Sequence, residues 1–226
     1  MKKIFAVLGL VFAFSGAIFF AAFYTSAANT TIAERFNVPN KKDEGASGTY
    51  TFDKAHTFIG FRVKHMGLIE VPGYFRDFTG SVNYDANDVK KSSVEFSAQI
   101  ASVDTGVAPR NAHLQKPEFF DAEKFPVMKF KSTKIEKKGK QWMVTGNLTI
   151  RDVTKSVTFP FDIVGFIVGE GGTRMGITAD TMINRRDYGV SYDQKLPNGT
   201  PAVADEIKIN LQIEANMSAP AATTTK

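Results

Sequence analysis

The stretch from Ile207 to Glu214, IKINLQIE, carries the clearest structural signal in this chain. Isoleucine or leucine occupies every second position, and lysine, asparagine, glutamine and glutamate occupy the positions between. Successive side chains of a β-strand point to opposite faces, so this alternation predicts a strand with one face on a core and the other in water. The stretch from Val94 to Ile100, VEFSAQI, has the same period.

Six further segments show this period of two, so we expect about eight antiparallel strands and an all-β domain. Turns at 137–140 and 169–172 separate neighbouring strands as hairpins. The one segment with helical character is 110–116. Periodicity alone does not separate a barrel from a sandwich, but eight strands close naturally into a barrel that has no exposed edges, and we favour the barrel. The expected strands are 57–66, 74–84, 93–100, 127–136, 141–150, 156–166, 173–183 and 207–214.

The N-terminus has the layout of a secretory signal peptide: two lysines, an apolar run from Ile4 to Tyr24, and small residues up to Ala28. The run exceeds the usual signal core of roughly 7–15 residues and is long enough to span a bilayer, so an uncleaved anchor is the alternative. We interpret residues 1–28 as the signal peptide or anchor, 29–48 as a flexible spacer, 49–217 as the folded domain and 218–226 as a disordered tail.

Composition narrows the class of protein. The chain has no cysteine, and export without disulfides suits a bacterial envelope, so we expect a periplasmic or secreted protein. The formal net charge is +5, but the lysines are scattered over strand faces. A basic stripe interleaved with aromatic residues is what nucleic acid needs, and its absence from the sequence argues against nucleic-acid binding.

Motifs that would carry an enzymatic reaction or a metal are missing from the sequence. The histidines are His56, His65 and His113, and no two of them have metal-ligand spacing. The chain contains no HExxH and no GxSxG motif. We therefore expect no enzymatic activity, no metal and no cofactor. An enzyme that uses His65 or His113 as acid or base on a lipid remains an alternative.

The stretch from Arg110 to Thr133, RNAHLQKPEFFDAEKFPVMKFKST, points to a kind of ligand. Polar groups able to bind a head group stand next to aromatic surface able to bind a tail. Ordinary core packing accounts for most of the phenylalanines, and a lining around a tunnel is the sharper interpretation of the rest. The combination favours an amphiphilic ligand over a reaction.

Several motifs in the same order identify a resemblance that covers residues 50–217. They include FIGFRVKH, GYFRDFTGSVNYD, RNAHLQKPEFFDAEKFP, GNLTIRDVTKSVTF, INRRDYG and ADEIKINLQIE. On these the chain resembles the YceI-like family, the lipocalin-like, polyisoprenoid-binding proteins of bacterial envelopes. It departs from the family pattern at Tyr50, where a tryptophan is frequent, and at Asn111, where an aspartate usually follows the arginine.

The resemblance implies an eight-stranded antiparallel lipocalin-like barrel with one short helix, whose apolar tunnel holds a polyprenyl phosphate or a quinone-like isoprenoid. It implies neither enzymatic activity nor a metal, and such barrels often pair as homodimers. Transient contact with a membrane is consistent with it. The alternatives are a protein that binds a fatty acid or acyl amide, and an envelope protein that acts through surface contacts without a ligand.

The candidate ligand-binding residues fall into three groups. Those on the expected inward face of 57–66 are Ile59, Phe61, Val63 and His65. The aromatic lining is expected from Phe75, Phe96, Phe119, Phe120 and Phe130. The polar groups expected to meet the head of the ligand are His65, Arg110, His113 and Arg185.

Overall fold

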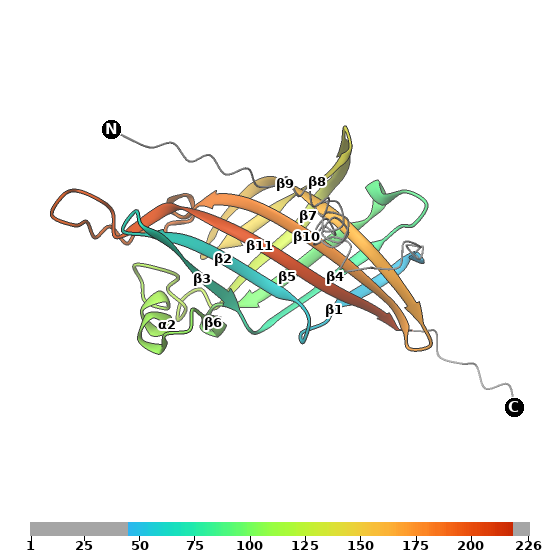
Figure 1. The fold of residues 1–226 in the computed structure, drawn as a ribbon, viewed down its shortest axis with the longest axis horizontal. Coiled ribbons are helices and arrows are strands. Elements are labelled where there is room, and N and C mark those ends of the chain that lie inside the picture. The colour runs from blue at the N-terminus through green and yellow to red at the C-terminus, as the bar shows by residue number, and fades with distance from the viewer. Residues whose placement is uncertain (1–44, 219–226) are drawn as a thin grey trace, which may run out of the picture. The chain divides into compact units, whose positions relative to one another are not determined.

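The computed structural model describes residues 45–218, and the strands form one continuous antiparallel sheet (Figure 1). The predicted signal peptide or anchor, spacer residues 29–44 and tail residues 219–226 lie outside the described residues. The strands are β1 (Gly48–Phe52), β2 (Phe58–His65), β3 (Ile69–Phe75), β4 (Phe78–Tyr84), β5 (Ser93–Gln99), β6 (Val103–Asp104), β7 (Val127–Lys138), β8 (Gln141–Ile150), β9 (Val153–Gly169), β10 (Gly172–Asn184) and β11 (Val203–Ser218).

The sheet closes on itself as an eight-stranded barrel, as predicted. β1 and β2 lie end to end along β11: Thr51 pairs with Asn216, and Phe58 pairs with Gln212. β3 and β4 continue each other in the same way, and so do β5 and β6, because β6 pairs with β3 while β5 pairs with β4. The eleven strand segments therefore form eight strands of the barrel, because three of these strands consist of two segments each. Each strand pairs with its neighbours in sequence, and β11 closes the ring against β1 and β2.

Two strand predictions need correction. The expected strand 74–84 is the end of β3 followed by β4, with a break at Arg76 and Asp77. The breaks in the strands that consist of two segments lie next to one another. Phe75 pairs with Val103 on one side of these breaks, and Phe78 pairs with Ala98 on the other side. Phe75 and Phe78 are both buried although they lie three residues apart, so the alternation shifts by one position at the break. The sequence analysis did not predict β1, β6 or the first five residues of β3.

The predicted hairpins at 137–140 and 169–172 join β7 to β8 and β9 to β10. The predicted helix 110–116 is observed as α2 (Ala108–Leu114), which begins earlier and includes Pro109 in its first turn. A proline is tolerated there because its missing N–H would have no partner within the helix. Short 3-10 turns are η1 (Val89–Lys91), η2 (Ile100–Ser102) and η3 (Arg185–Tyr188).

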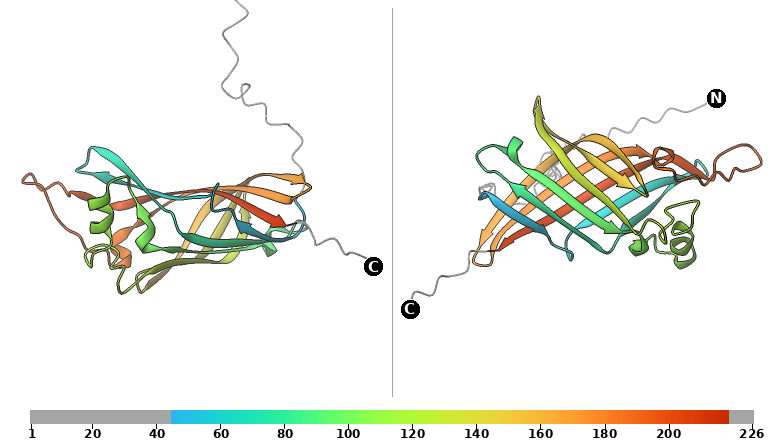
Figure 2. Two further views of the ribbon diagram at one scale, coloured as in Figure 1. Left: turned by 90° about the horizontal axis from the view of Figure 1, so that it is seen from below. Right: turned by 180° about the vertical axis from the view of Figure 1, so that it is seen from behind.

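The two ends of the barrel are built differently (Figure 2). α2 and the segment that follows it cover one end, beside β3 and β6. At the opposite end, Tyr50, Tyr84 and Phe166 form a ring cluster with centroid separations of 5.2–6.2 Å. Tyr50 is completely buried and donates a hydrogen bond to the carbonyl of Ala46 at 2.8 Å, so this part of the predicted spacer packs on the barrel. Within residues 45–218, none of the helices has the length and apolar character that crossing a membrane requires.

Candidate ligand-binding cavity

The inward faces of the strands enclose a cavity of about 130 Å³ at the α2 end, which we call the near compartment. Apolar side chains at every second strand position make most of its wall, as the alternation predicts. Nine of the twelve predicted residues line it: Ile59, Phe61, Val63, Phe75, Phe96, Phe119, Phe120, Phe130 and Arg185. That these residues bind a ligand stays a prediction.

A second cavity of about 60 Å³, the far compartment, lies toward the Tyr50 end of the barrel. It is lined by Met175, Ile177 and Ala179 of β10, whereas Thr181 and Ile183 of the same inward face line the near compartment. The two compartments therefore follow each other along the barrel axis.

Four residues line both compartments and form the neck between them: Phe96, Phe130, Phe159 and Leu211. The ring of Phe130 is 5.9 Å from that of Phe96 and 5.5 Å from that of Phe159, measured between centroids. Aromatic rings at these separations are in packing contact, so the neck is a constriction made of aromatic edges and faces.

The described lining of the near compartment contains three side chains with polar atoms: Thr181, Arg185 and Tyr188. They lie close in sequence because Thr181 lies near the end of β10, and Arg185 and Tyr188 are the first and last residues of the following turn η3. The lining residues with polar atoms are thus gathered on one segment, whereas nearly all of the surface that the cavity presents is apolar.

Arg185 is a buried cation, with 5% of its side chain exposed. Its guanidinium donates to the backbone carbonyls of Val190 (3.0 Å) and Ala204 (3.0 Å), and it forms an ion pair with Asp205 at 2.7 Å. Burial, and then the charge of Arg186, lower the pKa of Arg185 while Asp205 opposes the shift, and an arginine remains charged at neutral pH. These bonds explain how the fold holds a charge beside an apolar wall.

Tyr188 is 1% exposed, and its hydroxyl makes no hydrogen bond to another residue within 45–218. Burial raises the pKa of this hydroxyl, which keeps it protonated and able to donate. A donor without a partner beside an apolar cavity is free to bond an acceptor on a ligand.

Three of the four predicted head-group residues lie outside the cavity lining. His65 is exposed at the end of β2, where it pairs with Ile69 and Val203, so the inward face of this strand ends at Val63. Arg110 bonds the hydroxyl and carbonyl of Thr105, both at 2.8 Å. His113 is 2.9 Å from Glu118 and is about half exposed.

The segment after α2 is fixed over the end of the barrel by Arg151, a residue that the sequence analysis did not single out. Its Nη1 donates to the carbonyls of Pro117, Phe119 and Gly189 at 2.8–2.9 Å. Arg151 has φ of 58°, which points its side chain back from the β8–β9 turn. Because Phe119 and Phe120 line the cavity, this clamp positions part of the lining.

Asn111, the departure from the family pattern, organises the turn before α2. Its Oδ1 accepts from the amide and the hydroxyl of Thr105, at 2.9 and 2.7 Å, and its Nδ2 donates to Asp104 at 3.2 Å. The amide of Gly106, and then Arg76 and Asn111, lower the pKa of Asp104 to about 2. Asn111 therefore acts on the turn and lies outside the cavity lining.

One cluster outside the cavity has the residue types of a metal site. Asp53, His56 and Glu214 meet where β1 ends, with candidate ligand atoms within 4.8 Å of one another. His56 Nδ1 is 3.0 Å from Asp53, and Glu214 is paired with Arg174, so the carboxylates already have partners. The cluster ties the break between β1 and β2 to β11.

The sequence analysis missed much of the lining, including Leu148, Ile150, Phe159, Thr181, Tyr188 and Ile209. The period-two inward faces of the expected strands 141–150, 156–166, 173–183 and 207–214 contain the signal for most of these. Tyr188 lies in a turn, where no periodicity marks it.

A closed antiparallel barrel around an apolar cavity belongs to the small-molecule-binding class of β-barrels. The chain belongs to the YceI-like family, since the model of the YceI-like domain matches residues 50–215. A UPF0312 protein of Serratia proteamaculans is 40% identical over 149 residues, which are 64% of this chain and 77% of that protein.

Two solved structures extend this comparison. The Campylobacter jejuni YceI protein is 33% identical with a TM-score of 0.59, over 75% of this chain and 98% of that one. A polyisoprenoid binding domain from Saccharophagus degradans has a TM-score of 0.57 over 77% of this chain and 99% of that one. Its identity of 12% makes this second likeness one of fold alone.

Proposed function

We propose that the barrel binds a long-chain isoprenoid lipid, a polyprenyl phosphate or a quinone-like molecule, and carries or stores it in the bacterial envelope. The observation that carries the proposal is the shape and chemistry of the cavity. Its apolar lining continues past the neck into a second apolar compartment, while its polar side chains gather at Thr181, Arg185 and Tyr188. This distribution suits an amphiphile with one head and one long tail.

Membership of the YceI-like family and the polyisoprenoid binding of the Saccharophagus domain support the choice of an isoprenoid. The two head groups proposed share hydrogen-bond acceptor oxygens, which the free hydroxyl of Tyr188 suits. Arg185 adds a positive charge, but Asp205 offsets it, so a neutral quinone carbonyl and a phosphate are both candidates. A fatty acid or acyl amide has the same layout and is the chemical alternative.

Energetics favour exchange with a membrane. Burying each CH₂ group of a tail is worth roughly 0.8 kcal/mol relative to water, which for many prenyl units would exceed any attainable affinity. A membrane already removes the tail from water, so transfer from membrane to barrel is close to balance. Selectivity then depends on the length and shape of the cavity and on the polar groups near its end.

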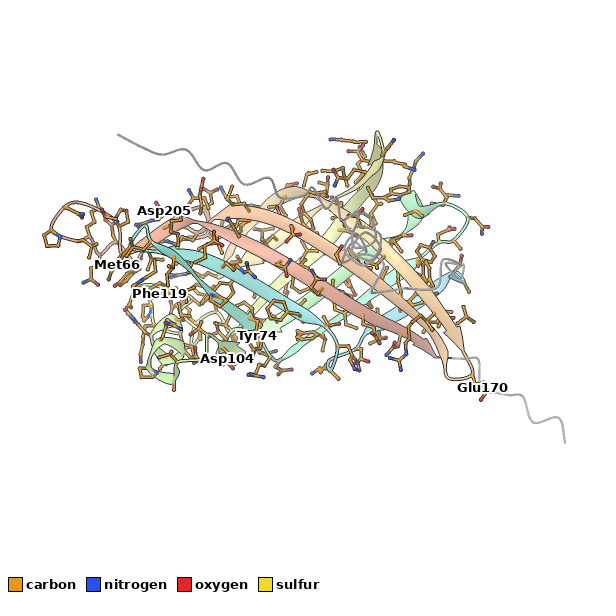
Figure 3. The ribbon with its side chains drawn as sticks, viewed as in Figure 1. Met66, Tyr74, Asp104, Phe119, Glu170 and Asp205 are labelled. Carbon is orange, nitrogen blue, oxygen red and sulfur yellow. The ribbon has the colours of Figure 1, made fainter. Side chains whose placement is uncertain are left out.

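Such exchange calls for transient contact with a membrane, and the turn Met66–Ile69 is suited to it. Leu68 and Ile69 are 79% and 66% exposed, which is unusual for large apolar side chains. The turn adjoins the near compartment because His65 pairs with Val203, which lines it. Figure 3 shows Met66 near Asp205 at this end of the barrel, with Glu170 at the other.

Native mass spectrometry with organic extraction, on protein purified from its own host, tests the proposal. We expect a stoichiometric prenyl lipid, whose mass identifies the head group. The variant Phe61→Asp places a charge in the near compartment and should purify empty. Phe58→Asp is the matched control, on the same strand but 37% exposed, and should retain the lipid.

The proposal is contradicted if both variants lose the lipid, or if the wild type and both variants all purify without lipid. A protein free of ligand at every stage favours the surface-contact alternative, in which a partner or a second copy binds the outside of the barrel. The enzymatic alternative needs His65 or His113 near the substrate, and neither lines the cavity. A turnover screen with prenyl phosphates and acyl amides that gives a histidine-dependent product would revive it.

A further inference from the structure

The neck is built from side chains of four strands, of which β5 and β7 are neighbours in the sheet. Phe96 belongs to β5, Phe130 to β7, Phe159 to β9 and Leu211 to β11. Phe96 and Phe130 are direct cross-strand partners. β8 separates β7 from β9, and β10 separates β9 from β11, so the side chains that form the neck come from well-separated parts of the barrel wall.

A glycine sets how far the neck is closed. On β8, a Cβ atom at Gly146 would lie 2.4 Å from Cζ of Phe130 and 2.7 Å from the carbonyl of Lys131. The tip of the Phe130 ring therefore occupies the space that a side chain at position 146 would fill. This close approach holds the ring back against the sheet and keeps it from extending further across the axis.

The far compartment has an apolar surface and is suited to a tail. Tyr84, a member of the aromatic cluster with Tyr50 and Phe166, lines its far end. Apart from Tyr84, the described lining of this compartment includes one polar side chain, Ser92, whose hydroxyl already accepts a hydrogen bond from the amide of Asp85. Along β10, Arg185 to Ala179 covers about 20 Å and Ala179 to Met175 about 13 Å, at roughly 3.3 Å per residue.

We infer that the far compartment selects ligands by the length and thickness of the tail, with the neck admitting one slender chain. This inference rests on the proposed function. The near compartment binds the head and the first part of the tail, and a tail too short to pass Phe130 gains nothing from the space beyond. We expect the four side chains of the neck to exclude lipids with two tails.

The chain's single tryptophan provides a readout of the far compartment. Trp142 pairs across the strands with Phe161, which lines that compartment, and their ring centroids are 6.5 Å apart. A tail that reaches Phe161 changes the surroundings of this pair. A tail that stops in the near compartment does not.

The experiment uses delipidated full-length protein and a series of prenyl alcohols with one head group: geraniol, farnesol, geranylgeraniol and solanesol, delivered from cyclodextrin. Affinity is measured by calorimetry and Trp142 emission is recorded at saturation. We expect the affinity to rise with length and the emission to shift only for members long enough to pass the neck.

Ala179→Phe fills the far compartment and should weaken binding of the longest alcohol at least tenfold, while farnesol binds as to wild type. Thr178→Phe, on the adjacent position of β10 outside both linings, is the matched control and should leave both affinities unchanged. Phe130→Leu opens the neck, and we expect it to accelerate uptake of the longest alcohol more than uptake of farnesol. If Ala179→Phe fails to fold, Phe130→Leu still tests the inference.

The outcomes separate this inference from the proposed function. If wild-type protein binds no alcohol of any length, the proposed function fails. If it binds all of them, but Ala179→Phe and Phe130→Leu treat long and short tails alike, the lipid carrier stands and the selection by the far compartment is wrong. Length-independent Trp142 emission contradicts the inference in the same way.

Discussion

Arg185 begins the turn η3 directly after β10, where its side chain lines the cavity and its charge must also be satisfied. Replacing it by methionine removes the donor from the carbonyls of Val190 and Ala204 in a buried place. We expect Arg185→Met to lower the free energy of unfolding by about 2–4 kcal/mol, measured by urea denaturation.

Arg186 is the matched control, because it also pairs with Asp205 but is 33% exposed. Arg186→Met should cost less than about 1 kcal/mol, as is usual for exposed ion pairs. Equal losses in the two variants would show that burial of Arg185 is unimportant.

Gly146 is the other residue whose role depends on what surrounds it. Gly146→Ala forces Phe130 and the β7 backbone to move, so we expect a loss of about 1–3 kcal/mol in the free energy of unfolding. At Gly165 on β9, an added Cβ meets nothing within 4 Å, and Gly165→Ala should change stability by less than about 0.5 kcal/mol. Calorimetric melting of both variants checks this, and a Gly146→Ala protein as stable as wild type would refute the close approach.

At the scale of elements, the β2–β3 turn has a conformation that presents its apolar residues outward. Met66 and Gly67 both have positive φ, 52° and 72°, and the amide of Met66 bonds the carbonyl of Ala202 at 3.0 Å. The turn is therefore anchored to the chain beside β11. Such an anchored apolar tip can insert into a lipid surface with little loss of chain entropy.

We predict that the double variant Leu68→Ser/Ile69→Ser binds vesicles of phosphatidylglycerol and phosphatidylethanolamine about tenfold more weakly than wild type, in a flotation assay. The control is Val164→Ser/Ile167→Ser on β9, where Ile167 is also 66% exposed but lies toward the β9–β10 hairpin. It should bind vesicles as wild type does. If both variants bind vesicles equally weakly, exposed apolar side chains promote membrane binding at either end of the barrel, and the β2–β3 turn has no special role.

At the scale of the whole molecule, closure of the barrel depends on the seam where β1 and β2 meet β11. The hydrogen bond from His56, and then the amide of Ala55, lower the pKa of Asp53 to about 2 from an ordinary 3.8. Asp53 in turn raises the pKa of His56 above its ordinary 6.5. Asn216 on β11 also donates to Asp53 at 3.1 Å, which ties the pair to the closing strand.

The sign of the pH dependence follows from these shifts. Because the pKa of the Asp53 carboxyl is lowered, its ionised form stabilises the fold above about pH 4, and this stabilisation is lost as the pH falls toward 2. Because the pKa of His56 is raised, its protonated form stabilises the fold below about pH 6.5, and this stabilisation is lost as the pH rises above that value. We expect the urea midpoint of Asp53→Asn to lie furthest below that of the wild type between about pH 4 and about pH 6.5, and the two midpoints to converge near pH 2. Asp77→Asn, which removes an exposed ion pair with Lys54, is the control. A constant difference from pH 2 to 7 would contradict the role of the seam.

Local alternation determined most of the fold. The strand containing Ile207–Glu214 and the hairpins at 137–140 and 169–172 follow from side-chain period and turn residues, which act between neighbours in the chain. The same period placed Ile59, Phe61 and Val63 on the cavity wall, and the pattern of family motifs indicated a barrel. The break at Arg76 and Asp77 was missed, although the three-residue spacing of the buried Phe75 and Phe78 marks a shift in the alternation there.

What the sequence by itself determined is therefore which side chains face inward, since that depends only on the two-residue period of a strand. The tertiary structure decided which of them meet across the barrel. Closure brought Phe96, Phe130, Phe159 and Leu211 together as a neck, and it placed Arg185 and Tyr188 in the lining while leaving His65, Arg110 and His113 outside. These outcomes depend on strand register and on the path of turns and of the α2 segment, which are set by contacts between residues distant in sequence.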